Sequence, residues 1–328
     1  MPQSNFRVLV STDLGGDPDD VQSLIHLLHY SDVLGIEGIV SSPGPGSTNR
    51  VAGIREWIER TDLDYLRAHG HPELMTEVAA LAAVRQGITS PGSPSPERAT
   101  EGSRRIVERA MAPDPHDLDR PLWVLVWGSL TDVAQALHDQ PDIAARIRIY
   151  AIGSSNTTAD PASRDYVYRL MQERYPELWW IENGILPRFQ HDTFRGMYLA
   201  GNQSGEWGGR AFVEQNIRGR GTTHNGKYSE ITGDAMPLAR HPGSELQILK
   251  AGDTPSVLYL LSSVRGGVGD VDDPTQPNWG GQFRRPDPGR YPNYYVDLDA
   301  PAEVCHTTIN RWRVDYLRDW KARWAWYE

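Results

Sequence analysis

STDLGGDPDDVQSLIHLLHYSD, residues 11–32, is the stretch that decides how this chain folds. It continues the apolar run FRVLVS (residues 6–11), whose length and branched side chains are typical of a strand. Across Asp19–Tyr30 the apolar residues recur at the spacing of one helix face, which predicts a helix. The run LGIEGIV (residues 34–40) then has the composition of a second strand. The sequence therefore predicts that the chain begins with a βαβ unit.

Strand-like and helix-like segments continue to alternate after this unit. Residues 122–127 (LWVLVW) form a nearly continuous apolar run, as expected for a strand that is buried on both faces. A helix is predicted at Thr131–His138 and a further strand at Ile147–Ile152. Strands that alternate with helices indicate an α/β fold, in which helices flank a mostly parallel sheet.

The second half of the chain carries weaker signals. Residues 201–245 are polar and rich in glycine, which predicts long loops at the edge of the sheet. Residues 307–326 are aromatic and basic, and we expect them to form a packed C-terminal helix. The sequence shows no internal repeat and no linker. It therefore predicts a single domain over residues 1–328, with residues 301–328 as a helical extension packed on it.

The composition limits the possible partners. A net charge of −10 argues against nucleic acid, because a phosphate backbone attracts basic surfaces. The sequence has no apolar run approaching the ~20 residues that cross a bilayer, so no membrane partner is expected. The first residues, MPQSNFRVLVSTD, lack the features of a signal peptide, which predicts a cytoplasmic location. The single cysteine, Cys305, excludes a zinc site built from several cysteines.

Tryptophan is unusually frequent, with 11 residues in the chain and five of them between Trp279 and Trp326. One interpretation is that these rings pack in the core. The other is that they form a sugar-binding surface, because aromatic faces suit the C–H faces of carbohydrates. The sequence leaves both interpretations open.

Four aspartates, Asp13, Asp17, Asp19 and Asp20, gather where the first strand meets the first helix. In open parallel sheets, ligands bind at such carboxyl ends of strands. Clustered carboxylates repel one another unless a proton or a cation intervenes. Calcium suits such a cluster, because it takes six to eight oxygen ligands at ~2.3–2.6 Å.

Helix capping is the alternative explanation for these acids. Asp17 is a suitable N-cap, Pro18 suits the first helical position, and Asp19 and Asp20 favour the helix dipole. Capping does not explain Asp13, which stands at the end of the strand. On local chemistry alone, a metal site and a capped helix both remain possible.

The same residues resemble the Asp-x-Asp-x-Gly-x-Asp-Asp signature of the nucleoside hydrolases, with two extra residues and with Ser11 in place of the first aspartate. The chain more closely resembles the nucleoside-hydrolase-like domain of a bacterial family of cellulose-binding proteins. That similarity runs from about residue 6 to the C-terminus, and other segments also carry it: LGIEGIV (34–40), TFRGMY (193–198), GDTPSVLYLL (252–261) and NWGGQF (278–283).

The resemblance implies a calcium site and assigns its ligands. Asp13, Asp20 and Asp253 match calcium-binding aspartates, and Trp127 falls where a backbone carbonyl binds the ion. Asp19 matches the residue that holds the ribose hydroxyls. Asp253 also has a structural interpretation, because it begins a helix at Thr254 in the manner of a cap.

The sequence differs from that of the nucleoside hydrolases at positions where they recognise the nucleobase and the sugar. Gly252 stands where some of them have a histidine that assists the leaving base, and residues 41–48 lack the family's sugar-binding asparagine. The Glu-x-Asn pair that grips the ribose has only a loose counterpart in Glu182 and Asn183. The resemblance thus supports the cation site more strongly than nucleoside specificity.

The resulting prediction is a calcium-dependent hydrolase of an N- or O-glycosidic bond in a furanosyl (ribose-like) substrate. Asp13 would activate the water, Asp19, Glu182 and Asn183 would bind the sugar, and His224 would protonate the leaving group. The alternative is a non-catalytic, calcium-dependent carbohydrate-binding protein. In either case the expected partner is a small sugar or nucleoside, and the resemblance implies a possible homo-oligomer.

Overall fold

The computed structural model describes residues 4–44, 50–201, 203–222, 230–240, 245 and 247–328. Eight strands form one sheet in the order β3-β2-β1-β4-β5-β6-β10-β9, and β9 alone runs antiparallel to its neighbour. The strands are β1 (Phe6–Thr12), β2 (Leu34–Ser41), β3 (Val84–Gln86), β4 (Leu122–Val126), β5 (Ile147–Ile152), β6 (Trp179–Asn183), β9 (Phe283–Arg284) and β10 (Tyr294–Asp297). A separate two-stranded sheet pairs β7 (Ala239–Arg240) with β8 (Gln247–Ile248).

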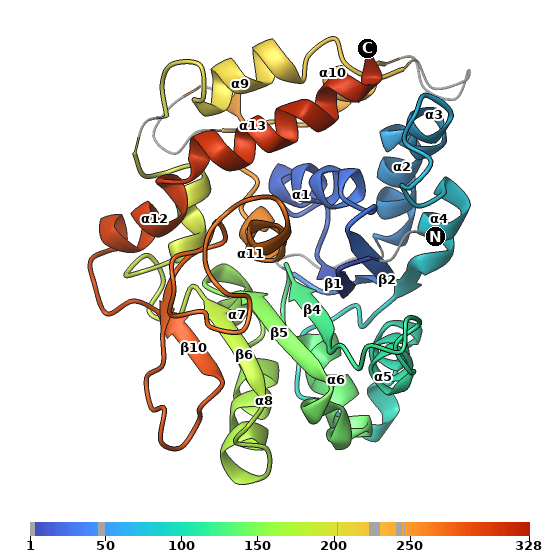
Figure 1. Ribbon diagram of the computed structural model, residues 1–328. Coiled ribbons are helices and arrows are strands. Elements are labelled where there is room, and N and C mark those ends of the chain that lie inside the picture. Colours follow the sequence, from blue (N-terminus) through green and yellow to red (C-terminus); the bar gives the residue numbers. More distant parts are fainter. Residues whose placement is uncertain (1–3, 45–49, 202, 223–229, 241–244, 246) are drawn as a thin grey trace.

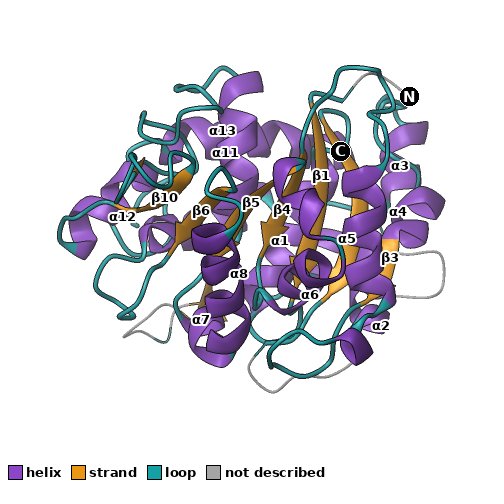
Figure 2. Ribbon diagram, turned by 90° about the horizontal axis from the view of Figure 1, so that it is seen from below, coloured by secondary structure: helices purple, strands orange, loops and turns teal. Residues whose placement is uncertain are grey.

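Helices cover both faces of the large sheet (Figure 1). One layer, with its shorter companions, consists of α1 (Pro18–His29), α2 (Val51–Thr61), α3 (Leu63–Ala68), α4 (Glu77–Ala83), α9 (Gly209–Asn216), α11 (Thr254–Val264), α12 (Ala302–Asn310) and α13 (Arg313–Trp324). The other layer, seen from below in Figure 2, consists of α5 (Glu101–Met111), α6 (Thr131–Asp139) and α8 (Pro161–Glu173). The short helices α7 (Ser155–Ala159) and α10 (Thr232–Ala235) lie in connections. Among the described residues, no helix is long and apolar enough to cross a membrane.

The central strands are buried on both faces, as the apolar run of β4 predicted. Side chains alternate between two cores: Val8, Trp123 and Leu125 face the layer of α1 and α11. Leu9 and Val124 face the layer of α5, α6 and α8. This alternation confirms the predicted α/β architecture and the opening βαβ unit, since β1 and β2 pair in parallel around α1.

The structure corrects one prediction about the second half of the chain and refines another. Residues 201–245 are not only loops, because they include α9, α10 and β7, and Phe212 and Val213 of α9 are buried in the core. The tail is helical and packed as predicted, but a turn at Arg311 and Trp312 divides it into α12 and α13. The turn allows α12 to pack against residues 193–197 while α13 packs against α1.

The tryptophans near the C-terminus belong to the core. Trp279, Trp320 and Trp324 are buried, and Trp312 and Trp326 pack against the same cluster. This favours the core-packing interpretation over a sugar-binding surface for these five rings.

A buried pair of histidines links α1 to the aromatic tail. His26 stacks on Trp320 with ring centroids 4.2 Å apart. Trp320 Nε1 donates to His29 Nδ1 at 3.1 Å, so the proton of this neutral imidazole sits on Nε2, 3.0 Å from the Tyr327 hydroxyl. Burial lowers the pKa of His26 to about 3 and lowers the pKa of His29 well below its ordinary value. The contact between α1 and α13 therefore depends on both histidines staying neutral.

We expect acid to weaken this contact. The unfolded chain takes up these protons near pH 6.5 and the folded chain does not, so stability is full above pH 6.5 and falls as the pH drops toward about 3. One pH unit below 6.5, each such histidine costs about 1.4 kcal/mol of unfolding free energy.

The measurement is urea unfolding of the parent chain and of His26→Phe between pH 5 and 8. Phenylalanine keeps the stack on Trp320 but does not titrate. The free energy of unfolding of the variant should therefore rise relative to that of the parent as the pH falls. A constant difference between the two proteins across this range would contradict the assignment.

Candidate metal centre

The acidic residues meet at the point where the strand order of the sheet reverses, between β1 and β4. Asp13 directly follows β1, and Asp19 and Asp20 stand in the first turn of α1. Asp253 is the residue before α11, which packs beside α1. Such a switch point at the carboxyl ends of parallel strands is where open α/β sheets bind ligands.

Hydrogen bonds fix the loop that carries Asp13. The Thr12 hydroxyl donates to Asp20 Oδ1 at 2.6 Å and accepts from the backbone N–H of Leu14 at 3.1 Å. The Arg50 guanidinium donates to the carbonyl oxygens of Asp13 and Leu14. The end of β1 and the start of α1 are therefore held as one unit, with their carboxyl groups directed to the same place.

Three of these acids form a compact group. Asp19, Asp20 and Asp253 each offer a carboxylate oxygen, and the three oxygens lie within 4.8 Å of one another. All three residues are buried, and burial raises the pKa of each carboxyl group. Repulsion among the acids raises the pKa of Asp20 and Asp253 further.

Asp13 lines the same pocket as this group. Burial raises its pKa to about 7, against the opposing effect of Arg50. Its carboxylate packs against the backbone of Gly44, where a Cβ atom would lie 1.6 Å from Asp13 Oδ2. Gly252 has a similar role for Asp19, because a Cβ there would lie 2.4 Å from Asp19 Oδ2. Two glycines therefore leave the room that the carboxylates occupy.

The structure also tests the capping interpretation. Asp17 and Asp253 are the N-cap residues of α1 and α11, yet neither side chain makes a capping hydrogen bond. Hydrogen bonding to the helix ends therefore does not account for the positions of these acids.

The charges in the pocket are far from balanced. Five aspartates line it: Asp13, Asp17, Asp19, Asp20 and Asp253. Lys250 contacts two of them, with Nζ touching Asp17 and lying 3.2 Å from Asp19 Oδ2, and the charge of Arg50 acts on Asp13. Arg195 also lines the pocket, but its charge is met by Asp192 at 2.8 Å. Four of these carboxylates are buried, all except that of Asp17. Four buried carboxylates fit a hard divalent cation, and an all-oxygen set suits calcium or magnesium better than zinc.

Trp127 contributes its backbone to the same pocket. It directly follows β4, and its side chain is buried with Nε1 donating to Ser256 Oγ at 2.8 Å. Its carbonyl oxygen accepts one hydrogen bond, from Asn156 Nδ2 at 2.7 Å. A carbonyl oxygen has two lone pairs, so this bond leaves one available to a cation.

The structure does not bring Glu182 and Asn183 to the acidic pocket. Arg164 grips the Glu182 carboxylate through two hydrogen bonds of 2.9 and 2.8 Å. Asn183 is buried and accepts from the backbone N–H of Phe194 at 2.8 Å, so it supports the pocket wall from behind. His224 lies outside the described residues.

Lys250, Tyr198 and Asn156 also line this pocket, although the sequence alone did not identify them as site residues. Lys250 stands three residues before Asp253 and its ammonium lies 5.5 Å from the Tyr198 ring centroid. Tyr198 ends the TFRGMY segment, whose place in the resemblance was the available signal. Asn156 follows β5 in a segment with no motif, so only the fold reveals its position.

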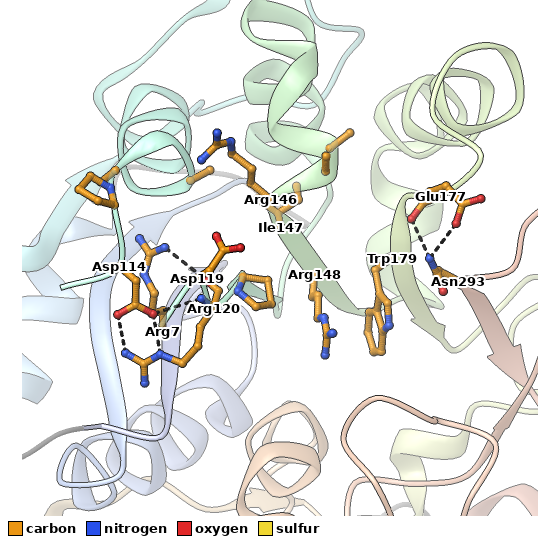
Figure 3. A pocket seen from close by; sticks show the side chains of 16 residues that line it. Arg7, Asp114, Asp119, Arg120, Arg146, Ile147, Arg148, Glu177, Trp179 and Asn293 are labelled. Carbon is orange, nitrogen blue, oxygen red and sulfur yellow. Dashed lines mark hydrogen bonds and ion pairs between the residues drawn. The ribbon is translucent and has the colours of Figure 1, made fainter. Parts of the chain in front are cut away.

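A larger cavity of about 630 Å³ lies at the opposite, amino-terminal ends of the strands (Figure 3). Its arginines are largely committed to neighbouring acids. Arg120 is bound by Asp114, and Arg7 by Glu37. The acidic pocket is therefore the better candidate for chemistry, although it is smaller.

The fold is that of the nucleoside hydrolases. A plant nucleoside hydrolase superposes with a TM-score of 0.52 at 13% identity, covering 94% of this chain and 99% of that chain. The effector protein XopQ, solved in complex with adenosine diphosphate ribose, superposes with a TM-score of 0.53 at 14% identity, covering 100% of this chain and 94% of that one.

Within this class, the chain belongs to the family described as cellulose-binding Sde182, nucleoside hydrolase-like domain, whose profile matches residues 7–283. A nucleoside hydrolase-related protein from Saccharophagus degradans, associated with carbohydrate metabolism, superposes with a TM-score of 0.69 at 20% identity. That superposition covers 99% of this chain and 72% of the other. No protein of curated function matches this chain in sequence.

The two glycines of the pocket loops give a matched test of its geometry. Gly44→Ala should push the Asp13 carboxylate aside, because the new Cβ would overlap Oδ2. We expect it to weaken the affinity for added Ca²⁺ by about tenfold or more, as when the support of a metal ligand is lost. Thermal unfolding with and without Ca²⁺ measures this.

Gly16→Ala is the control, because its Cβ would meet nothing closer than 3.4 Å. It should keep the calcium response of the parent chain. Equal responses in the two variants would show that the position of Asp13 does not matter for the ion.

Proposed function

We propose that this chain is a calcium-dependent hydrolase of the glycosidic bond of a furanosyl substrate. The observation that carries the proposal is the group formed by Asp19, Asp20 and Asp253, in one pocket with Asp13. The fold and the family suggest the class of reaction, and the acids are the residues that would hold the ion and activate the water.

Under this proposal Asp13, Asp20, Asp253 and the carbonyl oxygen of Trp127 hold the ion. Bound calcium would orient the attacking water and the vicinal hydroxyls of the sugar and would neutralise part of the acidic charge. Asp19 remains available to accept a hydrogen bond from a sugar hydroxyl. Its contact with Lys250 fixes the carboxylate for that purpose.

Asp13 is the proposed general base. Its carboxylate is buried, lines the pocket and stands beside Asp20 and Asp253, whose pKa values its charge raises. In the reaction, a carboxylate oxygen of Asp13 would take the proton of the water as that water attacks the anomeric carbon. The transition state has oxocarbenium character, and direct attack by water would invert the configuration at that carbon.

The leaving group needs a proton donor. Glu182 is engaged by Arg164 and by the Tyr294 hydroxyl, so we assign it no part at the acidic pocket. His224 keeps its proposed role as donor. Position 252, where some hydrolases have a histidine, has no room for one in this chain, because any side chain there would collide with Asp19.

The size of the pocket bears on the substrate. Its volume of about 240 Å³ is below the ~300–1,000 Å³ typical of small-molecule sites. We infer that it encloses one sugar ring and leaves the aglycone outside. An N-linked base and an O-linked sugar therefore both remain candidate leaving groups.

A non-catalytic, calcium-dependent carbohydrate-binding protein is the second candidate. The cellulose-binding description of the family favours it. The contact of Lys250 with Asp19 and Asp17 also favours it, because a built-in cation near the acids allows a stable pocket without turnover.

Asp13→Asn should separate the two candidates. Asparagine keeps the shape but cannot accept the proton, so hydrolysis of 4-nitrophenyl ribofuranoside should fall by about 10²–10⁴-fold, the usual contribution of a general base. Thermal unfolding would verify that the variant is folded.

Asp17→Asn serves as the comparison, since Asp17 lies on the same loop but is exposed and is paired with Lys250. It should retain most of the turnover. Full activity in Asp13→Asn would remove Asp13 as the base. A parent chain that binds sugars in the presence of calcium but turns over no furanoside or nucleoside would favour the binding protein.

A further inference from the structure

A third cavity, of about 430 Å³, lies on the α8 face of the sheet, between α8, the end of β6 and β10. We call it the Tyr168 groove. The side chains that matter for its chemistry are Arg164, Asp165, Tyr168, Glu182, Arg284 and Tyr294. Its volume falls within the ~300–1,000 Å³ of small-molecule sites, unlike that of the acidic pocket.

The Tyr168 groove is close to the acidic pocket. A narrow cavity of about 10 Å³, room for a single water, lies between them. It shares Gly153 and Asn156 with the acidic pocket and shares Arg164 and Glu182 with the groove. A thin layer of side chains therefore separates the two sites.

The walls of the groove are fixed before any ligand arrives. Arg164 holds Glu182 through two hydrogen bonds, and the Tyr294 hydroxyl donates to Glu182 Oε2 at 2.5 Å. The Arg164 guanidinium lies 4.5 Å from the centroid of the Tyr168 ring, which meets the Tyr294 ring edge to face at 5.7 Å. Such preorganisation reduces the entropy that binding must overcome.

One polar group in the groove has no partner. Arg284 Nε is buried and donates no hydrogen bond among the described residues. Buried donors are nearly always satisfied, so an unsatisfied one needs an explanation. Nε itself is closed off by protein atoms, but no hydrogen bond or ion pair among the described residues engages the rest of the Arg284 guanidinium, so its terminal N–H groups can donate to a ligand in the groove.

The charges of the groove define the ligand. The two arginines, Arg164 and Arg284, face two acids, Glu182 and Asp165, so the lining is neutral as a whole. The half-buried ring of Tyr168 and the planar polar side chains beside it suit a ligand ring that has apolar C–H faces and hydroxyl edges. At the rim, Leu186 is 48% exposed and adds an apolar contact.

We propose that the Tyr168 groove binds a neutral saccharide made of pyranose units. The role of the groove as a subsite rests on the proposed function, whereas the site itself requires neither calcium nor turnover. A saccharide held here would lie beside the acidic pocket, so the groove would act as a second subsite for an extended substrate.

The test is calorimetric titration of the full chain with cellotetraose and with maltotetraose, in the presence of a chelator. Binding of either neutral tetrasaccharide is expected. Tyr168→Ala and Arg284→Ala should each weaken it by about tenfold or more, as expected for truncation of an anchor residue. Tyr168→Phe keeps the ring and should bind like the parent chain.

Tyr166→Ala is the matched control, because Tyr166 is on the same helix and packs on the same core but does not line the groove. It should bind like the parent. The proposal is overturned if neither saccharide binds or if the acidic tetragalacturonate binds more tightly than the neutral saccharides. It is also overturned if Tyr166→Ala lowers the affinity as much as Tyr168→Ala and Arg284→Ala do. Since the chelator removes calcium, failure here is separate from failure of the hydrolase proposal.

Discussion

The repulsion among buried carboxylates is the constraint on which the rest of this structure depends. Asp13, Asp19, Asp20 and Asp253 come from three different segments and are all buried. Burial raises the pKa of each, so the folded chain holds them together against both desolvation and like charge. A bound divalent cation would offset this unfavourable energy, and oxygen donors are the ligands that calcium prefers.

The surrounding fold supplies what this arrangement needs. The parallel sheet brings the ends of β1 and β4 together and directs the first turn of α1 toward the start of α11. Arg50 and Thr12 fix the loop around Asp13, and Gly44 and Gly252 leave room for the carboxylates. The Tyr168 groove lies next to this centre, so the proposed hydrolytic site and the proposed saccharide site would be neighbours.

Local patterns in the sequence were enough to predict the βαβ unit, the buried strand β4 and the placement of Asp13, Asp19 and Asp20 at one loop. Asp253 was assigned to the site only through the resemblance. More than 230 residues separate it from Asp20, and local sequence patterns do not reveal that α11 packs on α1 and brings the two acids together. Glu182 shows the limit of a motif, since it lies on β6 and its side chain pairs with Arg164 of α8, away from the acidic pocket. The break between α12 and α13 was likewise invisible, because it depends on which surfaces the two helices cover.

The most direct test of the central claim is a calorimetric titration of chelator-stripped protein with Ca²⁺. The account predicts binding at one site per chain, lost in Asp20→Asn and in Asp253→Asn, which contribute ligands from the two separate helix starts. Absence of calcium binding in the parent chain, or unchanged binding in both variants, would contradict the claim that these acids form a metal centre.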